Sequence, residues 1–141
     1  MKVLFICTGN ICRSPLAEAL ARSMYPDAEF ASAGLAAQAA LPASEGAIAV
    51  AAENGLSLAG HRSRPVDAVM LREADAALTM TAEHARILRA RFPVWAAKAA
   101  RLGDAAGLPR DVADPWLGGP DEYRACFREL ETLLERVKWR E

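Results

Sequence analysis

A strand, a short loop and a helix start follow one another within the first fifteen residues. Lys2 to Cys7 reads Lys-Val-Leu-Phe-Ile-Cys, an apolar run that predicts a strand buried on both faces of a parallel sheet. Thr8-Gly9-Asn10 ends the run, and Ser14 followed by Pro15 predicts the N-cap and first turn of a helix. A buried strand that leads directly into a helix is typical of a parallel α/β fold.

The remaining chain alternates helix and strand signals. Strands are predicted at 30–33, at 74–80 and within 94–102, and helices at 44–54, from Pro65, from Thr81 and from Pro120. This alternation predicts a three-layer α/β/α sandwich with a four-stranded parallel sheet. Because the chain has 141 residues, no internal repeat and no linker, we expect a single domain over residues 1–141.

Apolar side chains at helical spacing indicate which helix faces are buried. The helix over 44–54 is predicted to end at Gly55 and to bury Ala47, Ile48, Ala51 and Ala52. The helix that begins at Pro120 carries one apolar stripe opposite Glu and Arg residues, made of Tyr123, Cys126, Phe127, Leu130, Leu133, Leu134 and Val137. Cys126 is therefore expected to be a core residue.

Composition and charge exclude several classes of function. Lys and Arg number 17 against 18 Asp and Glu, so the net charge is -1 and no nucleic acid or anionic membrane partner is expected. The N-terminal apolar run is too short for a secretion signal and no segment is long enough to cross a membrane, which predicts a cytoplasmic protein. Three cysteines without paired CxxC spacing indicate no disulfide framework and no metal site, and leave a reactive thiol to consider.

Cys7 and Arg13 bracket the loop and are separated by five residues. Backbone N–H groups in front of a helix N-terminus can surround an anion, and five residues suffice to wrap three phosphoryl oxygens. Cys7 would then lie behind phosphorus as a thiolate and Arg13 would bind two oxygens, while Gly9 and Asn10 supply left-handed conformations. The alternative is structural, with Cys7 as a buried strand-end residue and Arg13 as a solvated helix-start residue.

The nine residues Cys-Thr-Gly-Asn-Ile-Cys-Arg-Ser-Pro at 7–15 resemble the active-site signature of the low-molecular-weight protein tyrosine phosphatases. This signature is highly specific. Weaker motifs fall in family order and spacing along nearly the whole chain: Ser32-Ala33-Gly34, Gly60-His61-Arg62-Ser63, Leu78-Thr79-Met80-Thr81 and Asp114-Pro115-Trp116. The resemblance implies a four-stranded parallel sheet flanked by helices, with no metal and no organic cofactor.

The resemblance also implies roles for the loop. Cys7 would be the nucleophile, Arg13 would bind the phosphoryl group, and Ser14 would stabilise the thiolate through its hydroxyl group. One side chain, that of Asn10, would hold the loop in shape through hydrogen bonds to Ser14, Ser32 and His61. The phosphate would contact the whole cradle: Thr8, Gly9, Asn10, Ile11, Cys12, Arg13 and Ser14.

A thiolate alone expels an alkoxide poorly, so the reaction needs a proton donor. Asp114 matches the family's general acid, which protonates the leaving oxygen and then activates water against the phosphocysteine. From spacing alone, Asp111 or Asp121 could equally be the general acid. The structural alternative is that Asp114-Pro115 only forms a turn. Trp116 matches an aromatic wall of the substrate pocket, to which Ile11 is also assigned; the structural alternative for Trp116 is a core position.

Several other residues have no catalytic match. His84 lies at the start of a helix and is assigned no role, and Trp95 and Trp139 are expected to be packing or surface residues. Cys12 is either a small packing residue or, under oxidation, the partner of Cys7 in a protective disulfide.

The resulting expectation is a phosphatase that acts on phosphotyrosine-containing proteins through a phosphocysteine and releases inorganic phosphate. Arginine phosphatases of the same fold have threonine at the position of Ile11, so the apolar Ile11 favours phosphotyrosine.

Thiol-coupled arsenate reductases need further cysteines, and none lies between Cys12 and Cys126. A non-enzymatic anion-binding module would not need Cys7, Arg13 and Asp114 together, so the presence of all three argues against this alternative. After Ser32-Ala33-Gly34, Leu35 is the only bulky residue before small ones, which predicts an open pocket rim.

Overall fold

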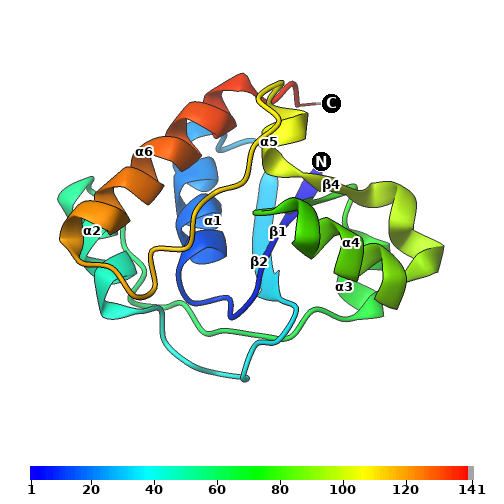
Figure 1. The fold of residues 1–141 in the computed structure, drawn as a ribbon, viewed down its shortest axis with the longest axis horizontal. Coiled ribbons are helices and arrows are strands. Elements are labelled where there is room, and N and C mark those ends of the chain that lie inside the picture. Colours follow the sequence, from blue (N-terminus) through cyan, green and yellow to red (C-terminus); the bar gives the residue numbers. More distant parts are fainter. Residues whose placement is uncertain (140–141) are drawn as a thin grey trace.

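The structure, a computed structural model, describes residues 1–139. In this part of the chain, four parallel strands form one sheet in the order β2-β1-β3-β4 (Figure 1). Their bounds are β1 Lys2–Cys7, β2 Glu29–Gly34, β3 Ala76–Thr79 and β4 Ala99–Arg101. Because β1 is paired on both sides and covered on both faces, residues 3–7 are all buried, as the apolar run predicts.

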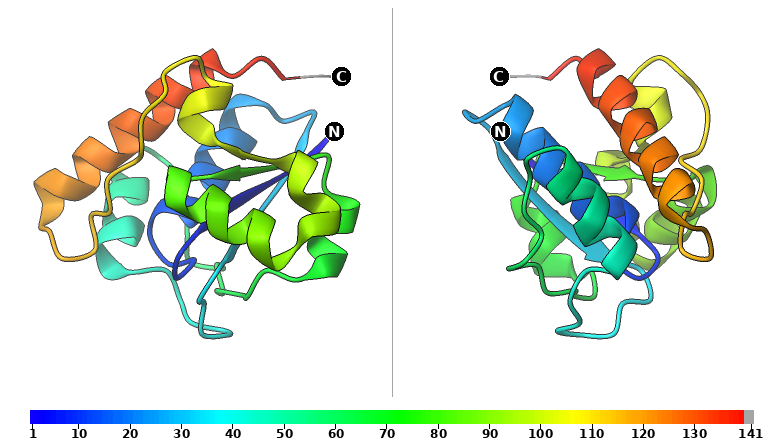
Figure 2. Two further views of the ribbon diagram at one scale, coloured as in Figure 1. Left: turned by 45° about the vertical axis from the view of Figure 1, so that its right-hand side comes forward. Right: turned by 90° about the vertical axis from the view of Figure 1, so that its left-hand side faces the viewer.

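Helices cover both faces of the sheet (Figure 2). One face carries α1 (Arg13–Met24), α2 (Glu45–Glu53), α5 (Leu102–Ala105) and α6 (Pro120–Arg136). The other carries α3 (Ala68–Glu73), α4 (Ala82–Arg91) and the short 3-10 helix η1 (Pro93–Lys98). The predicted three-layer sandwich is thus confirmed. No helix within residues 1–139 has the length and apolar character needed to span a membrane.

The alternating side chains of β1 divide the core into two clusters. Val3 and Phe5 point into the cluster under α1, α2 and α6, and Phe5 stacks on Phe30 with ring centroids 5.8 Å apart. Leu4 and Ile6 point into the cluster under α3 and α4. Because successive side chains of a strand point to opposite faces of the sheet, β1 packs against both helix layers.

The apolar stripe of α6 fills the larger cluster as predicted. Cys126 and Leu130 are buried there together with the stripe's other residues up to Leu134. The partly buried Trp139 packs against Phe30 with ring centroids 5.5 Å apart, so it is a packing residue. Trp95 packs against the smaller cluster with the ammonium group of Lys98 over its ring.

Two predicted helix starts were wrong. Helix α1 begins at Arg13, and the Ser14 hydroxyl group is occupied by hydrogen bonds with Cys7 and Asn10 rather than by capping. Helix α3 begins at Ala68, because Asp67 accepts a hydrogen bond from the Met70 amide at 2.8 Å. Pro65 instead forms an isolated parallel bridge to the end of β2.

The buried face of α2 also differs from the prediction. Its buried residues are Ala47, Val50 and Ala51, whereas Ile48 is 37% exposed and Ala52 is exposed. The helix turns its small residues toward α6, where a Cβ at Gly46 would lie 2.3 Å from the Tyr123 ring. The hydrophobic pattern of the sequence does not show this close approach of Gly46 to the Tyr123 ring, which determines the face of α2 that is buried.

The carboxyl ends of β1 and β2 support the loop between β1 and α1. The Leu35 amide donates to the Cys7 carbonyl at 3.0 Å, and the Ala36 amide donates to the Thr8 carbonyl at 2.9 Å. A Cβ at Gly34 would lie 2.5 Å from the Thr8 carbonyl oxygen, so only glycine lets the two chains run this close. The loop is therefore held against the sheet edge by main-chain contacts.

We expect Leu130→Ala to lower the free energy of unfolding by about 2–5 kcal/mol, because Leu130 is completely buried and its truncation leaves a cavity. Urea unfolding measures this loss. Ile48→Ala, at a site that the sequence pattern places in the core, should cost less than about 1 kcal/mol. Equal losses in the two variants would contradict the observed orientation of α2.

Candidate active site

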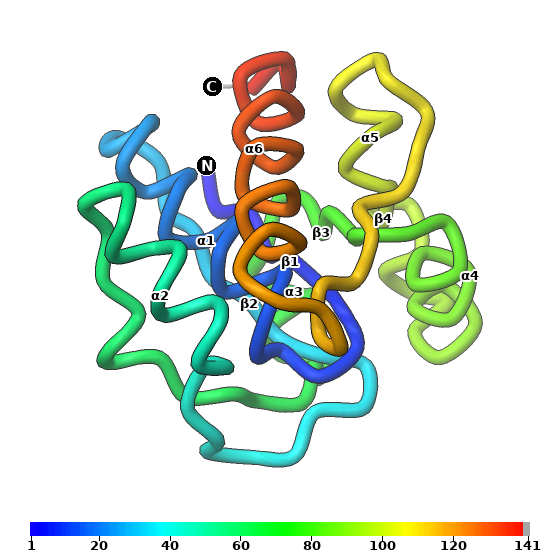
Figure 3. The backbone as a smooth tube through the Cα atoms, turned by 60° about the vertical axis from the view of Figure 1, so that its left-hand side comes forward, coloured from blue at the N-terminus to red at the C-terminus, as the bar shows by residue number. Residues whose placement is uncertain are grey.

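The loop after β1, the start of α1 and the segment before α6 meet at one end of the sheet (Figure 3). They enclose a cavity of about 200 Å³ beyond the carboxyl end of β1. Its lining consists of Cys7, Thr8, Gly9, Ile11, Cys12, Arg13, Asp114 and Trp116. The structure thus brings together the predicted nucleophile, cation, proton donor and aromatic wall from segments about a hundred residues apart.

The Cys7 sulfur is buried at the floor of this cavity. It lies 2.9 Å from the Ser14 Oγ and accepts a hydrogen bond from the Asn10 amide at 3.3 Å. Among the described residues, the loop amides of Thr8, Gly9, Ile11 and Cys12 donate to no protein acceptor. A set of unpaired amides in front of a helix, next to a sulfur that accepts hydrogen bonds, suits an anion.

Asn10 determines the shape of the loop. It has a φ of 57°, is completely buried, and donates through Nδ2 to the Oγ atoms of Ser14 at 2.8 Å and Ser32 at 2.9 Å. Its Oδ1 accepts from the Arg64 amide at 3.0 Å, a contact the sequence analysis did not identify. His61 Nε2 lies 2.7 Å from the main-chain oxygen of Asn10, and so contacts the backbone rather than the side chain as predicted.

Gly9 does not share this left-handed conformation, so the prediction for it was wrong. The positive-φ glycines among the described residues are Gly55 and Gly107. A Cβ at Gly9 would meet only the Ile11 side chain, at an ordinary 3.7 Å. The single left-handed residue of the loop is therefore Asn10.

A chain of hydrogen bonds leads from the loop to the surface. The Ser32 hydroxyl, which receives a hydrogen bond from Asn10, donates to Glu18 Oε1 at 2.6 Å. Glu18 in turn forms an ion pair with Arg22 at 2.8 Å, one turn later on α1. Sequence analysis did not identify Glu18, because an Arg and a Glu at i,i+4 spacing on a helix read as an ordinary surface pair.

Arg13 is 5% exposed and is held by the segment that carries Asp114. Its Nη1 donates to the Val112 carbonyl at 2.9 Å, and its Nη2 lies 3.6 Å from Asp114 Oδ2. Asp114 is half exposed, and its Oδ1 accepts a hydrogen bond from the Trp116 amide at 3.1 Å. The guanidinium thus faces the cavity in a fixed orientation with the carboxylate beside it.

The other two candidate acids lie outside the cavity. Asp111 accepts hydrogen bonds from the Ala82 amide and from Arg101, each at 3.0 Å, and these contacts lower the pKa of its carboxyl group. Asp121 bonds to Arg124 on α6 at 3.1 Å. Of the carboxylates in residues 1–139, Asp114 alone lines the cavity with Cys7.

Ile11 and Trp116 form the mouth of the cavity, and Trp116 is 52% exposed. The alternative of a core tryptophan is therefore wrong. Leu35, predicted to be the bulky residue of the rim, is only 8% exposed and packs in the smaller core cluster instead. Another bulky residue, Leu41, lines an adjoining groove together with Ile11.

Cys12 and Cys126 differ from Cys7 in their surroundings. Cys12 contacts the Ser44 Oγ at 3.3 Å and the Tyr123 hydroxyl at 3.4 Å, and burial raises the pKa of its thiol. Burial likewise raises the pKa of the Cys126 thiol, to about 12. All three cysteines are free, so the disulfide between Cys7 and Cys12 stays a prediction. Residues 1–139 contain no cluster of three or more metal-binding side chains.

His84 contacts the active-site loop, although sequence analysis assigned it no role. It is buried, and its Nε2 lies 2.9 Å from the Thr8 Oγ1. Its Nδ1 is buried without a partner in the described structure. Burial, followed by the charge of nearby Arg13, lowers the pKa of the imidazole to about 4. The ring is therefore neutral and supports the loop from the side of α4.

We expect the pH dependence of stability to carry the signature of His84. The unfolded chain binds a proton at this site near pH 6.5, whereas the folded chain binds it only near pH 4, so stability falls as pH decreases through that window. His84→Gln removes this proton-linked loss. Urea midpoints measured from pH 7 to about pH 4 should fall less steeply in the variant; parallel curves would show that His84 is not held neutral.

Comparisons with known proteins agree with this geometry. The low molecular weight phosphotyrosine protein phosphatase family matches residues 2–139. A protein-arginine-phosphatase of Geobacillus stearothermophilus is 41% identical over 139 residues, covering 96% of this chain and 93% of its own. The low molecular weight protein-tyrosine-phosphatase Wzb of Salmonella typhi is 37% identical over 135 residues, with 96% and 87% of the two chains covered.

Solved structures show the same relationship. A mutant of the YwlE arginine phosphatase with a phosphorylated active-site serine superposes with a TM-score of 0.93 at 34% identity, covering 96% of this chain and 92% of that one. Match length, identity and fold point to one family of cysteine-dependent phosphatases. The chain belongs to the low molecular weight phosphotyrosine protein phosphatase family.

Proposed function

We propose that this protein hydrolyses phosphotyrosine in proteins, with Cys7 as nucleophile, Arg13 as phosphate ligand and Asp114 as general acid and base. The observation that carries the proposal is the convergence of these three side chains on one cavity of about 200 Å³. Family membership supports the reaction class. The protein acts in the cytoplasm on phosphotyrosine-containing proteins and releases inorganic phosphate.

In the first step the Cys7 thiolate attacks phosphorus, so that a sulfur–phosphorus bond forms while the bond to the tyrosine oxygen breaks. The loop amides and Arg13 neutralise the charge of the phosphoryl oxygens. Asp114 gives its proton to the departing phenolate oxygen. The Ser14 Oγ, 2.9 Å from the sulfur, and the Asn10 amide, which donates to it at 3.3 Å, hold the Cys7 sulfur in place for attack.

In the second step the Asp114 carboxylate accepts a proton from water, whose oxygen attacks the phosphorus of the phosphocysteine. The sulfur–phosphorus bond breaks, phosphate is released, and the Ser14 hydroxyl stabilises the departing Cys7 thiolate. Asp114 is restored to its protonated form, so the cycle closes without a further reagent. The half-exposed position of Asp114 gives water access to it.

The mouth of the cavity favours an aromatic leaving group. Ile11 and Trp116 face it with apolar side chains, between which a flat phenyl ring packs. The aromatic pair with Trp116 contributes about 0.5–1.5 kcal/mol beyond the apolar area that it buries. Phosphoserine has no ring, so it gains neither contact and is expected to be a poor substrate.

A protein-arginine phosphatase is the second candidate. Two of the compared proteins are arginine phosphatases, and one of them is 41% identical to this chain. The same cavity would use Cys7, Arg13 and Asp114 on a phosphorus–nitrogen bond. The guanidinium leaving group is planar and polar, however, and the apolar Ile11 side chain offers it no hydrogen bond.

We expect Cys7→Ser to lower kcat on phosphotyrosine peptides by at least about 10³-fold, because serine is not ionised at neutral pH. Asp114→Ala should lower kcat/KM, which reports the first transfer, by about 10²–10⁴-fold on phenyl phosphate and less on p-nitrophenyl phosphate, whose leaving group needs no proton. Stopped and continuous phosphate-release assays measure both effects. Activity surviving in Cys7→Ser, or equal losses on the two aryl esters, would overturn the assigned roles.

Substrate class is tested by comparing phosphotyrosine, phosphoserine and phosphoarginine peptides of one sequence. The parent protein should prefer phosphotyrosine, and Ile11→Thr should raise the ratio of phosphoarginine to phosphotyrosine hydrolysis, because threonine adds a hydroxyl group and removes apolar surface from the mouth. Ile11→Val, which keeps an apolar side chain, serves as the control. A parent preference for phosphoarginine would replace the first candidate with the second.

A further inference from the structure

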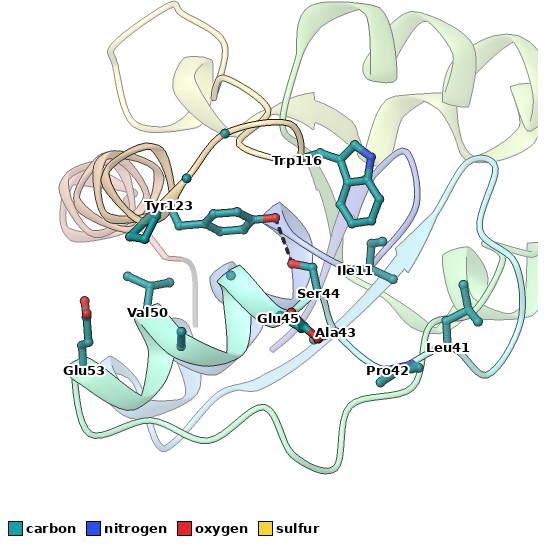
Figure 4. Close-up of a pocket in the computed structure, with 15 residues that line it drawn as sticks. Ile11, Leu41, Pro42, Ala43, Ser44, Glu45, Val50, Glu53, Trp116 and Tyr123 are labelled. Atoms are coloured by element: carbon teal, nitrogen blue, oxygen red, sulfur yellow. Dashed lines mark hydrogen bonds between the residues drawn. The ribbon is translucent and has the colours of Figure 1, made fainter.

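A second cavity adjoins the catalytic one between α2 and the segment that leads into α6 (Figure 4). It has a volume of about 570 Å³, nearly three times that of the catalytic cavity. We call it the α2–α6 groove. Its walls are residues of α2, the start of α6 and the chain between β2 and α2, including Leu41, Pro42, Ala49, Val50 and Pro120.

The α2–α6 groove is continuous with the catalytic cavity. Ile11 and Trp116 line both, so the two side chains form the boundary between them (Figure 4). A polypeptide whose phosphorylated side chain enters the catalytic cavity passes over this boundary with its neighbouring residues. The groove therefore lies where a residue that flanks the phosphorylated one reaches the protein.

The groove is preformed rather than created by a ligand. The Tyr123 hydroxyl lies 3.1 Å from the Ser44 Oγ, which joins the start of α6 to the start of α2. Gly46 packs so closely on the Tyr123 ring that a Cβ there would clash with it. Since both walls are fixed before binding, little ordering free energy opposes occupation of the groove.

The chemistry of the walls selects the occupant. The side chains that line the groove are mostly apolar, and Leu117, next to the lining residue Trp116 in the sequence, is 95% exposed. Glu45 is exposed at the rim, and Glu53 at the far end forms an ion pair with Arg124 at 2.7 Å. A large apolar side chain gains contact here, while an acidic side chain meets the Glu45 carboxylate at the rim, since the charge of Glu53 is already paired with Arg124.

We propose that the α2–α6 groove is a substrate subsite that binds a large apolar side chain flanking the phosphorylated residue and discriminates against acidic ones. The proposal rests on the proposed function, because the occupant belongs to the protein whose phosphoryl group is removed. Under this proposal, Ala49 and Glu45 determine substrate specificity, although neither touches the reacting atoms.

The first experiment measures kcat/KM for phosphotyrosine peptides that are otherwise built of Gly and Ser. Leu, Phe or Glu is placed at each neighbouring position in turn. At one position we expect Leu or Phe to raise kcat/KM by about tenfold over Gly, the gain from burying an apolar side chain, and Glu to lower it. A flat profile at all positions would overturn the proposal.

The second experiment fills the groove with Ala49→Trp. Ala49 is exposed and lines the groove, so the indole occupies it without disturbing the core. The apolar preference should then fall at least about fivefold, while hydrolysis of free phosphotyrosine stays unchanged. Ala52→Trp is the matched control, because Ala52 is exposed on the same helix but is not part of the groove lining. Equal effects of the two variants would refute the subsite.

Two further outcomes are decisive. Glu45→Gln should relieve the penalty against a flanking Glu and leave the apolar preference intact. A parent protein that sediments as a dimer, becomes a monomer in Ala49→Trp and shows no flanking preference would assign the groove to a second copy of the chain and overturn the proposal. Free phosphotyrosine and free phosphoarginine report on the proposed function separately: if only phosphoarginine is cleaved, the same flanking series on phosphoarginine peptides tests the groove.

Discussion

Asn10 is held at a φ of 57° by hydrogen bonds with Ser14, Ser32 and the Arg64 amide, and this left-handed turn lies in the middle of the loop that lines the cavity. Left-handed backbone is unfavourable for a residue with a side chain, so its partners must compensate the cost. They come from the first helix, the second strand and the chain before α3. The sheet and its helices must therefore be assembled before the loop between β1 and α1 has its shape.

The features that local chemistry dictates could be predicted from the sequence. The run at residues 2–7, the alternation of elements and the stripe on α6 led to the sheet, the layers and the main core. Features that depend on contact between distant segments could not. Ile48 looked like a core residue because the pattern does not show the approach of Gly46 to the Tyr123 ring, and Leu35 looked like a rim residue because its burial depends on α3 and α4.

In the candidate active site, too, features set by local sequence could be predicted, and features set by contacts between distant segments could not. The nine-residue signature pointed to Cys7, Arg13 and the cradle, and the structure places these residues around one cavity with Asp114. Spacing alone did not separate Asp114 from Asp111; the contacts of Asp111 with the Ala82 amide and Arg101 do. The contact of His84 with Thr8 could not be predicted, because nothing in the sequence near this histidine indicates that the fold brings the first turn of α4 to the loop after β1.

Arg13 donates to the Val112 carbonyl, and Val112 lies two residues before Asp114 on the same segment. Under the proposed function, the group that binds phosphate and the group that donates the proton are therefore mechanically linked, although they act on opposite sides of the bond that breaks. Any motion that carries this segment away from the cavity removes the acid and also loosens the guanidinium. Under the proposed function, a form that binds phosphate firmly would also keep its acid in place, so release of the product would coincide with loss of the acid.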